Sequence, residues 1–138
     1  MRLKNHTDIP TKLIREMIAF AKPANVTNFE VTIRNRGEGY SGHAAPRILT
    51  PSIVVSISKK KRRPQLLYRH LGGYLPMPAM TREETVLLVL AHELRHLWQG
   101  KVKRGRRVWG ARGQFSERDA DAYALRALRH WRRGEPMP

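Results

Sequence analysis

Two spacings of hydrophobic positions occur along the chain, and together they predict both helices and strands. In residues 11–21 the apolar side chains recur at helical spacing, with Pro10 before the segment and Pro23 soon after it. We expect an amphipathic helix there, because proline is tolerated at the start of a helix and interrupts one from within. In residues 29–34 apolar and polar side chains alternate, which is typical of a half-buried strand.

The middle of the chain predicts a loop, a strand and a hairpin. Residues 35–46 are rich in glycine and are expected to form a loop. Residues 52–58 are mostly β-branched and predict a strand. The run of cations at 59–63 would form the turn of a hairpin, with residues 65–71 as its second strand.

The most apolar helix is predicted to begin after Thr81. Thr81 and Glu84 match a capping box, in which each side chain accepts a hydrogen bond from the backbone N–H of the other residue. The helix is expected to run to about residue 99, with Gly100 ending it. Because its side chains are apolar almost all round in residues 86–94, it should be central and buried.

A last helix is predicted from Ser116, which can cap it together with Asp119, to about Arg133, just before Gly134. The predicted elements define an α+β fold: an N-terminal helix, a small and mostly antiparallel sheet, and a central helix packed on a C-terminal one. A chain of 138 residues has room for one domain of this kind, spanning residues 1–138.

Charge and cysteine content narrow the class of protein. Lys and Arg number 27 against 11 Asp and Glu, a net charge of +16, which predicts affinity for nucleic acid, an acidic protein or an anionic surface. The absence of cysteine excludes a disulfide framework, a thiolate zinc site and a cysteine nucleophile. No apolar run approaches the about 20 residues of a membrane span. The first residues do not resemble a secretory signal, so we expect a cytoplasmic protein with no membrane partner.

The predicted central helix carries the sequence HELRH at residues 92–96, an HExxH motif. His92 and His96 are one helical turn apart on the same face, so both imidazoles can reach one metal ion, and zinc prefers such nitrogen ligands. Glu93 is placed to take a proton from a metal-bound water molecule. Chance would produce about 0.015 such matches in a chain of this composition, so an accidental match on a solvated helix is disfavoured.

Two histidines leave a tetrahedral zinc ion short of a third protein ligand. Glu117 and Asp121 lie one turn apart on the last predicted helix, on the same face. Glu117 is the predicted third ligand, and Asp121 is predicted to accept the N–H of a ligating histidine and so to fix its tautomer. The alternative is a solvated acidic patch near a helix N-terminus, where the helix dipole favours carboxylates.

HELRH followed by ERDADAYA at residues 117–124 resembles the gluzincin metallopeptidases, which carry HExxH and a downstream helix with a glutamate ligand. The short chain is most similar to the minimal gluzincins and to the ImmA/IrrE-like peptidases, over residues 81 to about 128. This resemblance implies that His92, His96 and Glu117 bind one Zn²⁺ ion per chain, with Glu93 as the general base.

Other zinc-site patterns fit less well. A deformylase-like site needs a cysteine ligand, and an HExxHxxGxxH site needs a glycine and a histidine that residues 97–102 do not supply in that pattern. A SprT-like site needs a third histidine, for which only His130 is available downstream. Arg95 departs from the small residue that is common at its position in gluzincins, so the substrate stays open.

A peptidase also needs a group that stabilises the oxyanion or contacts the substrate. Tyr40 and His43, in the expected glycine-rich loop, and Tyr123, two residues after Asp121, are the candidates. Solvent exposure is the alternative for the first two side chains, and packing in the core is the alternative for Tyr123.

Basic residues gather in two segments that are candidates for binding an anion. They include Lys59, Lys60, Lys61, Arg62, Arg63, Arg104, Arg106 and Arg107. Cations interleaved with glycine and an aromatic residue are similar to a surface that follows a nucleic-acid backbone without reading its sequence. The alternative is a solvated face on a very basic protein.

The sequence therefore predicts a zinc-dependent metallopeptidase that hydrolyses peptide bonds. Its substrate would lie extended in a cleft and add a strand to an edge of the sheet, which strand 52–58 or its partner would provide. Two alternatives stay open: a basic nucleic-acid-associated protein whose zinc is structural or vestigial, and a protease that acts on DNA-bound proteins.

Overall fold

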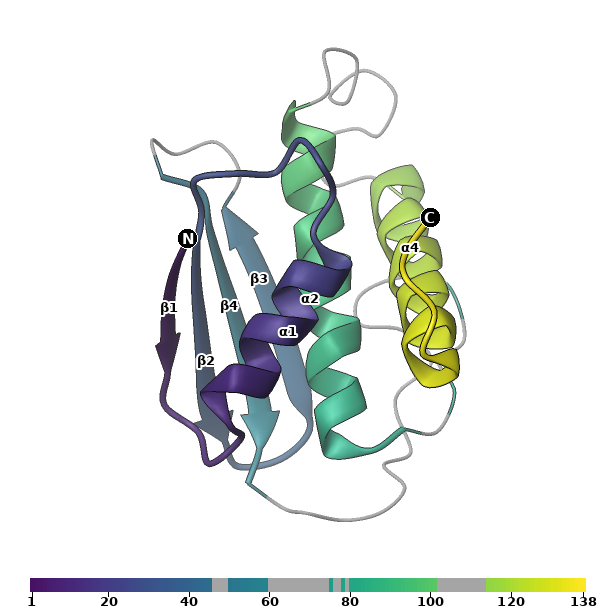
Figure 1. Ribbon diagram of the computed structural model, residues 1–138. Coiled ribbons are helices and arrows are strands. Elements are labelled where there is room, and N and C mark those ends of the chain that lie inside the picture. Colours follow the sequence, from purple (N-terminus) through teal and green to yellow (C-terminus); the bar gives the residue numbers. More distant parts are fainter. Residues whose placement is uncertain (46–49, 60–74, 76–77, 79, 102–113) are drawn as a thin grey trace.

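The computed structural model describes residues 1–45, 50–59, 75, 78, 80–101 and 114–138 (Figure 1). In this part of the chain the elements, in order, are β1 (Arg2–Asn5), α1 (Thr11–Ala21), β2 (Glu30–Arg36), β3 (Tyr40–Ala45), β4 (Ser52–Ser58), α2 (Arg82–Lys101) and α4 (Gln114–Arg133). The predicted α+β class is confirmed. Helix α1 has the predicted bounds, and its apolar stripe at Ile14, Met17 and Ile18 is buried.

The sheet is mixed rather than mostly antiparallel, so that part of the prediction is wrong. Its strand order is β1-β2-β4-β3, and both β1 with β2 and β2 with β4 are parallel pairs. Strand β3 runs antiparallel to β4. The cause lies in the connections: α1 crosses over between β1 and β2, which leaves both strands pointing the same way. Strand β4 then inserts between β2 and β3.

The glycine-rich segment is mostly strand, so the predicted loop over residues 35–46 is wrong. Strand β2 continues to Arg36, and β3 occupies Tyr40–Ala45. The side chains of β3 have a low strand propensity, but pairing with β4 satisfies the backbone hydrogen-bonding groups and decides the conformation. The turn between them places Gly39 at a φ of 70°, which glycine adopts without strain. The predicted hairpin strand at 65–71 lies outside the described residues.

Helices α1 and α2 lie over one face of the sheet (Figure 1). Helix α2 contacts β3, β4, α1 and α4, so it lies between the sheet and α4. Every residue from 86 to 94 is buried, which confirms the predicted central helix. His92 and Glu93 interrupt this apolar stretch and are therefore held inside the core. No helix in the described ranges is both long and apolar enough to cross a membrane.

The start of α2 is confirmed in detail, whereas two other predicted helix ends are wrong. The Thr81 N–H donates to Glu84 Oε1 at 2.9 Å and the Glu84 N–H donates to Thr81 Oγ1 at 3.1 Å, a reciprocal capping box. Gly100 does not end α2, which extends to Lys101. Helix α4 begins before Ser116, so Ser116 and Asp119 are not its cap; both contact α2 instead.

The end of α4 agrees with prediction. Gly134 has a φ of +67°, its N–H donates to the Trp131 carbonyl at 3.1 Å, and the Glu135 N–H donates to the His130 carbonyl at 3.0 Å. These two bonds form a Schellman motif, which satisfies carbonyls that the helix end would leave unpaired.

Helices α2 and α4 run antiparallel, and polar contacts join both ends of the pair. At one end Arg132 donates to Glu84, with 2.6 Å between Nε and Oε2. At the other end Gln99 Nε2 donates to the Ser116 carbonyl at 2.9 Å. Glu84 therefore serves both the capping box and the contact between helices. The hydrogen bond from Arg132 lowers the pKa of Glu84, although partial burial opposes it.

We predict that Glu84→Gln lowers the free energy of unfolding at neutral pH and that this difference disappears in acid. A glutamine at this position keeps the capping box but loses the charge that faces Arg132. The pKa of Glu84 is lower in the folded than in the unfolded protein, so its contribution is present above the unfolded pKa and is lost as the pH falls through the folded pKa. We expect an effect of about 0.5–1 kcal/mol, measured by urea unfolding at several pH values.

Thr81→Ala is the matched variant, because it removes the other half of the capping box and changes no charge. It should cost about 1 kcal/mol at every pH tested. An equal loss at low and neutral pH in Glu84→Gln would contradict the role given to the ion pair.

Candidate metal centre

Three side chains from two helices converge on one point. His92 and His96 lie one turn apart on α2, and Glu117 reaches them from the first turn of α4. The Nε2 atoms of the two histidines are 3.1 Å apart. Glu117 Oε2 is 3.1 Å from His92 Nε2, and Glu117 Oε1 is 3.2 Å from His96 Nε2.

The donor set and its spacing fit a zinc ion. Zinc binds histidine nitrogen and carboxylate oxygen at about 2.0–2.2 Å, so two ligand atoms at a tetrahedral angle are about 3.3–3.5 Å apart. The two histidine nitrogens, 3.1 Å apart, come close to this distance, and each carboxylate oxygen of Glu117 lies 3.1–3.2 Å from one of them. One ligand atom from each of the three residues lies within 4.8 Å of the others. Among the described residues, His92, His96 and Glu117 are the group of His, Cys, Asp or Glu side chains that could hold a metal ion together.

Asp121 lies behind His92, at the position that the sequence predicts. Its Oδ1 is 2.9 Å from His92 Nδ1, and its carboxylate is completely buried. Asp121 Oδ2 accepts a hydrogen bond from the Leu75 N–H at 3.1 Å. A carboxylate that accepts the Nδ1 proton leaves the Nε2 lone pair of His92 directed at the centre and fixes the orientation of the ring.

Gln99 orients the ring of His96, although no motif in the sequence predicted this role. Gln99 Oε1 is 2.8 Å from His96 Nδ1 and also accepts a hydrogen bond from Ser116 Oγ at 2.7 Å. Its amide nitrogen donates to the Ser116 carbonyl and to Asp119 Oδ2, each at 2.9 Å. The one signal in the sequence was its position three residues after His96, on the same side of the helix.

The carboxylates and imidazoles of the centre shift one another's pKa values. Burial lowers the pKa of His92, but hydrogen bonds to Asp121 and Glu117 outweigh it and raise the pKa to about 10. Burial raises the pKa of Glu117, but hydrogen bonds from His92 and His96 outweigh it and bring the pKa to about 2. A metal ion would have to displace the proton from His92, because histidine ligates in its neutral form.

Glu93 is next to the metal-binding group and is packed against the backbone of β3. Its side chain is 6% exposed, and burial raises its pKa, although the neighbouring His92 and His96 oppose the shift. A Cβ atom on Gly42 of β3 would lie 2.7 Å from Glu93 Oε1 and 2.6 Å from a methyl group of Val89. The absence of a side chain at Gly42 therefore makes room for the Glu93 carboxylate.

Arg95 links the two helices from the side of α2 that faces α4. Its Nε donates to Asp119 Oδ2 at 2.7 Å and its Nη2 donates to Asp119 Oδ1 at 3.2 Å, a two-pronged ion pair. Its guanidinium also lies over the Trp98 ring, 3.7 Å from the ring centre. Asp119, which the sequence analysis treated as a cap, thus holds both Arg95 and Gln99.

Three further residues were predicted to contact the substrate or the oxyanion, and the structure places each of them differently. Tyr40 belongs to the core at 9% exposure on a strand, so its expected place in a loop is wrong. Tyr123 is 7% exposed and its hydroxyl donates to the Ala21 carbonyl, which agrees with the packing alternative. His43 is exposed on β3 and close enough to Glu93 to influence its pKa.

The remaining candidates do not meet the centre. His130 lies in the last turn of α4, 3.4 Å from Glu135, and about 20 Å along the helix from Glu117. A third histidine ligand is therefore disfavoured. Lys59 is exposed at the end of β4. The other predicted anion-binding residues, Lys60, Lys61, Arg62, Arg63, Arg104, Arg106 and Arg107, lie outside the described residues.

No family model, curated protein or solved structure matches this chain in the three comparisons made. The resemblance to gluzincins therefore rests on the motif residues, and what the site does must be argued from its own geometry.

We predict that Gln99→Leu weakens zinc binding by about 10- to 100-fold, because His96 loses the acceptor that orients it. Competition with a chromogenic chelator measures the affinity. Ser116→Ala is the control: it removes the hydrogen bond between Ser116 and Gln99 but leaves Gln99 facing His96, so its affinity should stay within about threefold of the wild-type value. Equal affinities for Gln99→Leu and wild type would contradict the positioning role.

Proposed function

We propose that this protein is a zinc-dependent metallopeptidase of the gluzincin type. The observation that carries the proposal is the convergence of His92, His96 and Glu117 beside a buried glutamate, Glu93, on one helix. Three protein ligands leave a tetrahedral metal ion with one open position, which is typical of catalytic zinc sites, whereas structural sites are closed by four protein ligands. Within the described residues no fourth side chain joins the group.

Each residue of the centre has a distinct part in this proposal. His92, His96 and Glu117 would hold the zinc ion, which would polarise a carbonyl group and lower the pKa of a water molecule. Asp121 and Gln99 orient the two imidazoles. Glu93 would accept a proton at its carboxylate from the attacking water and pass it to the leaving amine. A glutamate with a raised pKa suits this exchange, because a base works best when its pKa approaches the working pH.

The sheet suggests where a peptide would lie. Of the two edges that the sequence left open, strand 52–58 or its partner, strand 52–58 is β4 and is central, whereas its partner β3 is an edge strand of the sheet that the described residues form. An extended peptide can add a strand to such an edge through backbone hydrogen bonds. Since Gly42 of β3 abuts Glu93, a peptide on this edge would pass close to the proposed base. The side chain of His43 is exposed on the same strand.

Three variants test the proposal, with zinc content measured by mass spectrometry and hydrolysis measured on a fluorescence-quenched peptide library. His92→Ala and Glu117→Ala should lose zinc and activity together, because each removes a ligand. Glu93→Gln should keep about one zinc ion per chain and lose at least about 100-fold in turnover, because it removes the base and no ligand.

Zinc retained in Glu117→Ala would overturn the three-ligand site. Full activity in Glu93→Gln would overturn the catalytic role of that residue. Zinc bound without hydrolysis of any library peptide by the wild type would favour the structural-zinc alternative.

A fourth variant tests the close approach of β3 to Glu93. We predict that Gly42→Ala lowers activity by about tenfold or more, because the added methyl group displaces the Glu93 carboxylate from its place beside the ligands. Gly37→Ala is the matched control, since a Cβ atom there meets nothing within 4 Å. Activity per zinc-loaded, folded chain is the quantity to compare. Equal activity in the two variants would show that the position of Glu93 does not depend on Gly42.

A further inference from the structure

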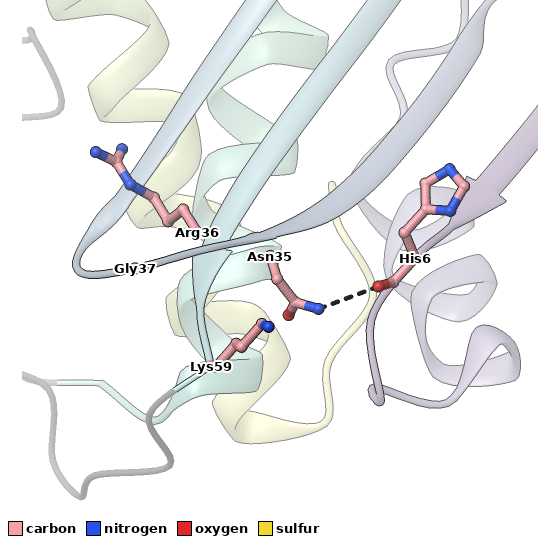
Figure 2. Close-up of a pocket in the computed structure, with 5 residues that line it drawn as sticks. All are labelled: His6, Asn35, Arg36, Gly37 and Lys59. Carbon is pink, nitrogen blue, oxygen red and sulfur yellow. Dashed lines mark hydrogen bonds between the residues drawn. The ribbon is translucent and has the colours of Figure 1, made fainter.

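A second group of polar residues lines a hollow at the end of the sheet where the three parallel strands finish. The hollow has a volume of about 640 Å³ and is lined by His6, Asn35, Arg36, Gly37 and Lys59 (Figure 2). His6 follows β1, Asn35 and Arg36 end β2, and Lys59 follows β4. The carboxyl ends of parallel strands are a common place for ligands in proteins with open sheets.

The lining carries positive charge and no carboxylate. Arg36 and Lys59 supply the positive charge. Arginine presents a planar fork that matches a phosphate group, and lysine binds phosphate as a point charge. The chemistry of the hollow therefore favours an anion, and a phosphate group in particular.

Hydrogen bonds and one ion pair hold the segments that form this hollow. Arg82, at the start of α2, is 4% exposed; its Nε donates to the Ser58 carbonyl at 2.8 Å, and its Nη1 is 2.9 Å from Asp8 Oδ1. One side chain thus fixes the residues that adjoin Lys59 and His6. The amide nitrogen of Asn35 also donates to the His6 carbonyl at 3.1 Å, the bond drawn in Figure 2. The hollow is therefore formed before any ligand arrives.

The positive charge continues from the hollow along the outer face of the sheet. Leu3, Val31 and Ile33 face the core, so the alternating positions on β1 and β2 face outwards. These outward positions include the cations Arg2, Lys4, Arg34 and Arg36. The one carboxylate among them, Glu30, is 3.8 Å from Arg2. Cations two residues apart on a strand are spaced by about 6.7 Å.

We propose that this surface, the hollow together with the outer face of β1 and β2, binds the phosphate backbone of a nucleic acid without reading its sequence. A line of spaced cations suits a linear polyanion, and the net charge of +16 favours such a partner. A lipid surface fits less well, because stable attachment to a bilayer also needs apolar side chains that enter it; binding of an acidic peptide is an outcome of the test below. In the described ranges Met1 is the large hydrophobic side chain that is exposed.

The surface is separate from the metal centre. Arg82 adjoins the hollow, and His92 lies ten residues further along α2, about 15 Å away along the helix axis. A nucleic acid bound at the end of the sheet would thus leave the metal centre accessible. The proposal does not depend on zinc or on peptidase activity.

The test is fluorescence anisotropy of a labelled DNA oligonucleotide, single-stranded and duplex, between about 50 and 200 mM salt. The double variant Arg36→Gln/Lys59→Gln removes two cations from the hollow. Its slope of log affinity against log salt should become shallower by about 1.4 for single strands and about 1.8 for duplex, if each cation neutralises one phosphate.

Arg129→Gln/Arg133→Gln is the matched control, because it removes the same charge from exposed positions on α4. Its salt slope should equal that of the wild type.

Three results would overturn the proposal: no DNA binding at the lowest salt, an equal change in slope for the two double variants, or equal competition by polyglutamate or by anionic lipid vesicles. A change confined to Arg36→Gln/Lys59→Gln, with circular dichroism showing an intact fold, would support it.

Discussion

The antiparallel contact between α2 and α4 is the constraint on which the structure depends most. Four polar contacts follow one another along the two helices: Glu84 with Arg132, His92 with Asp121, Arg95 with Asp119, and Gln99 with Ser116. Because each joins one residue of α2 to one residue of α4, they fix the register of the two helices. The ligand atoms of Glu117 are brought to His92 and His96 only in that register, since a shift of one residue would rotate its side chain by about 100°.

This arrangement places charge inside a hydrophobic core, which is costly unless every group has a partner. Each imidazole has a partner on both ring nitrogens. Glu117 contacts the Nε2 atoms of both histidines, Asp121 contacts Nδ1 of His92, and Gln99 contacts Nδ1 of His96. The pKa of His92, raised to about 10, shows that the carboxylates outweigh the effect of burial. A divalent cation at this point would face the same carboxylates and would have to displace that proton. The same interactions that stabilise the packing of the helices therefore also hold the three candidate ligands together.

Helix α2 also connects the two surfaces for which we propose functions. Its middle carries the two histidines of the proposed metal centre, and its first residue, Arg82, forms hydrogen bonds with the segments around the hollow at the end of the sheet. If both proposals hold, a nucleic acid bound to this chain would bring the proteins attached to it close to the metal centre. That combination is one of the alternatives left open by the sequence, and the DNA-binding and zinc variants separate its two parts.

The sequence determined those features that depend on local spacing. The bounds of α1, the capping box at Thr81, the buried face of α2 and the pairing of His92 with His96 all follow from side chains within a few positions of one another. Glu117 and Asp121 were predictable as a pair because helical spacing places them on one face. Only the tertiary structure decided the rest, because it depends on contacts between distant segments. Strand β3 forms despite its weak propensity because β4 offers it hydrogen bonds, and the sheet is mixed because α1 crosses between β1 and β2. Gln99, Gly42 and the Arg36–Lys59 hollow gain their roles from neighbours far away in the chain, and no local pattern marks such neighbours.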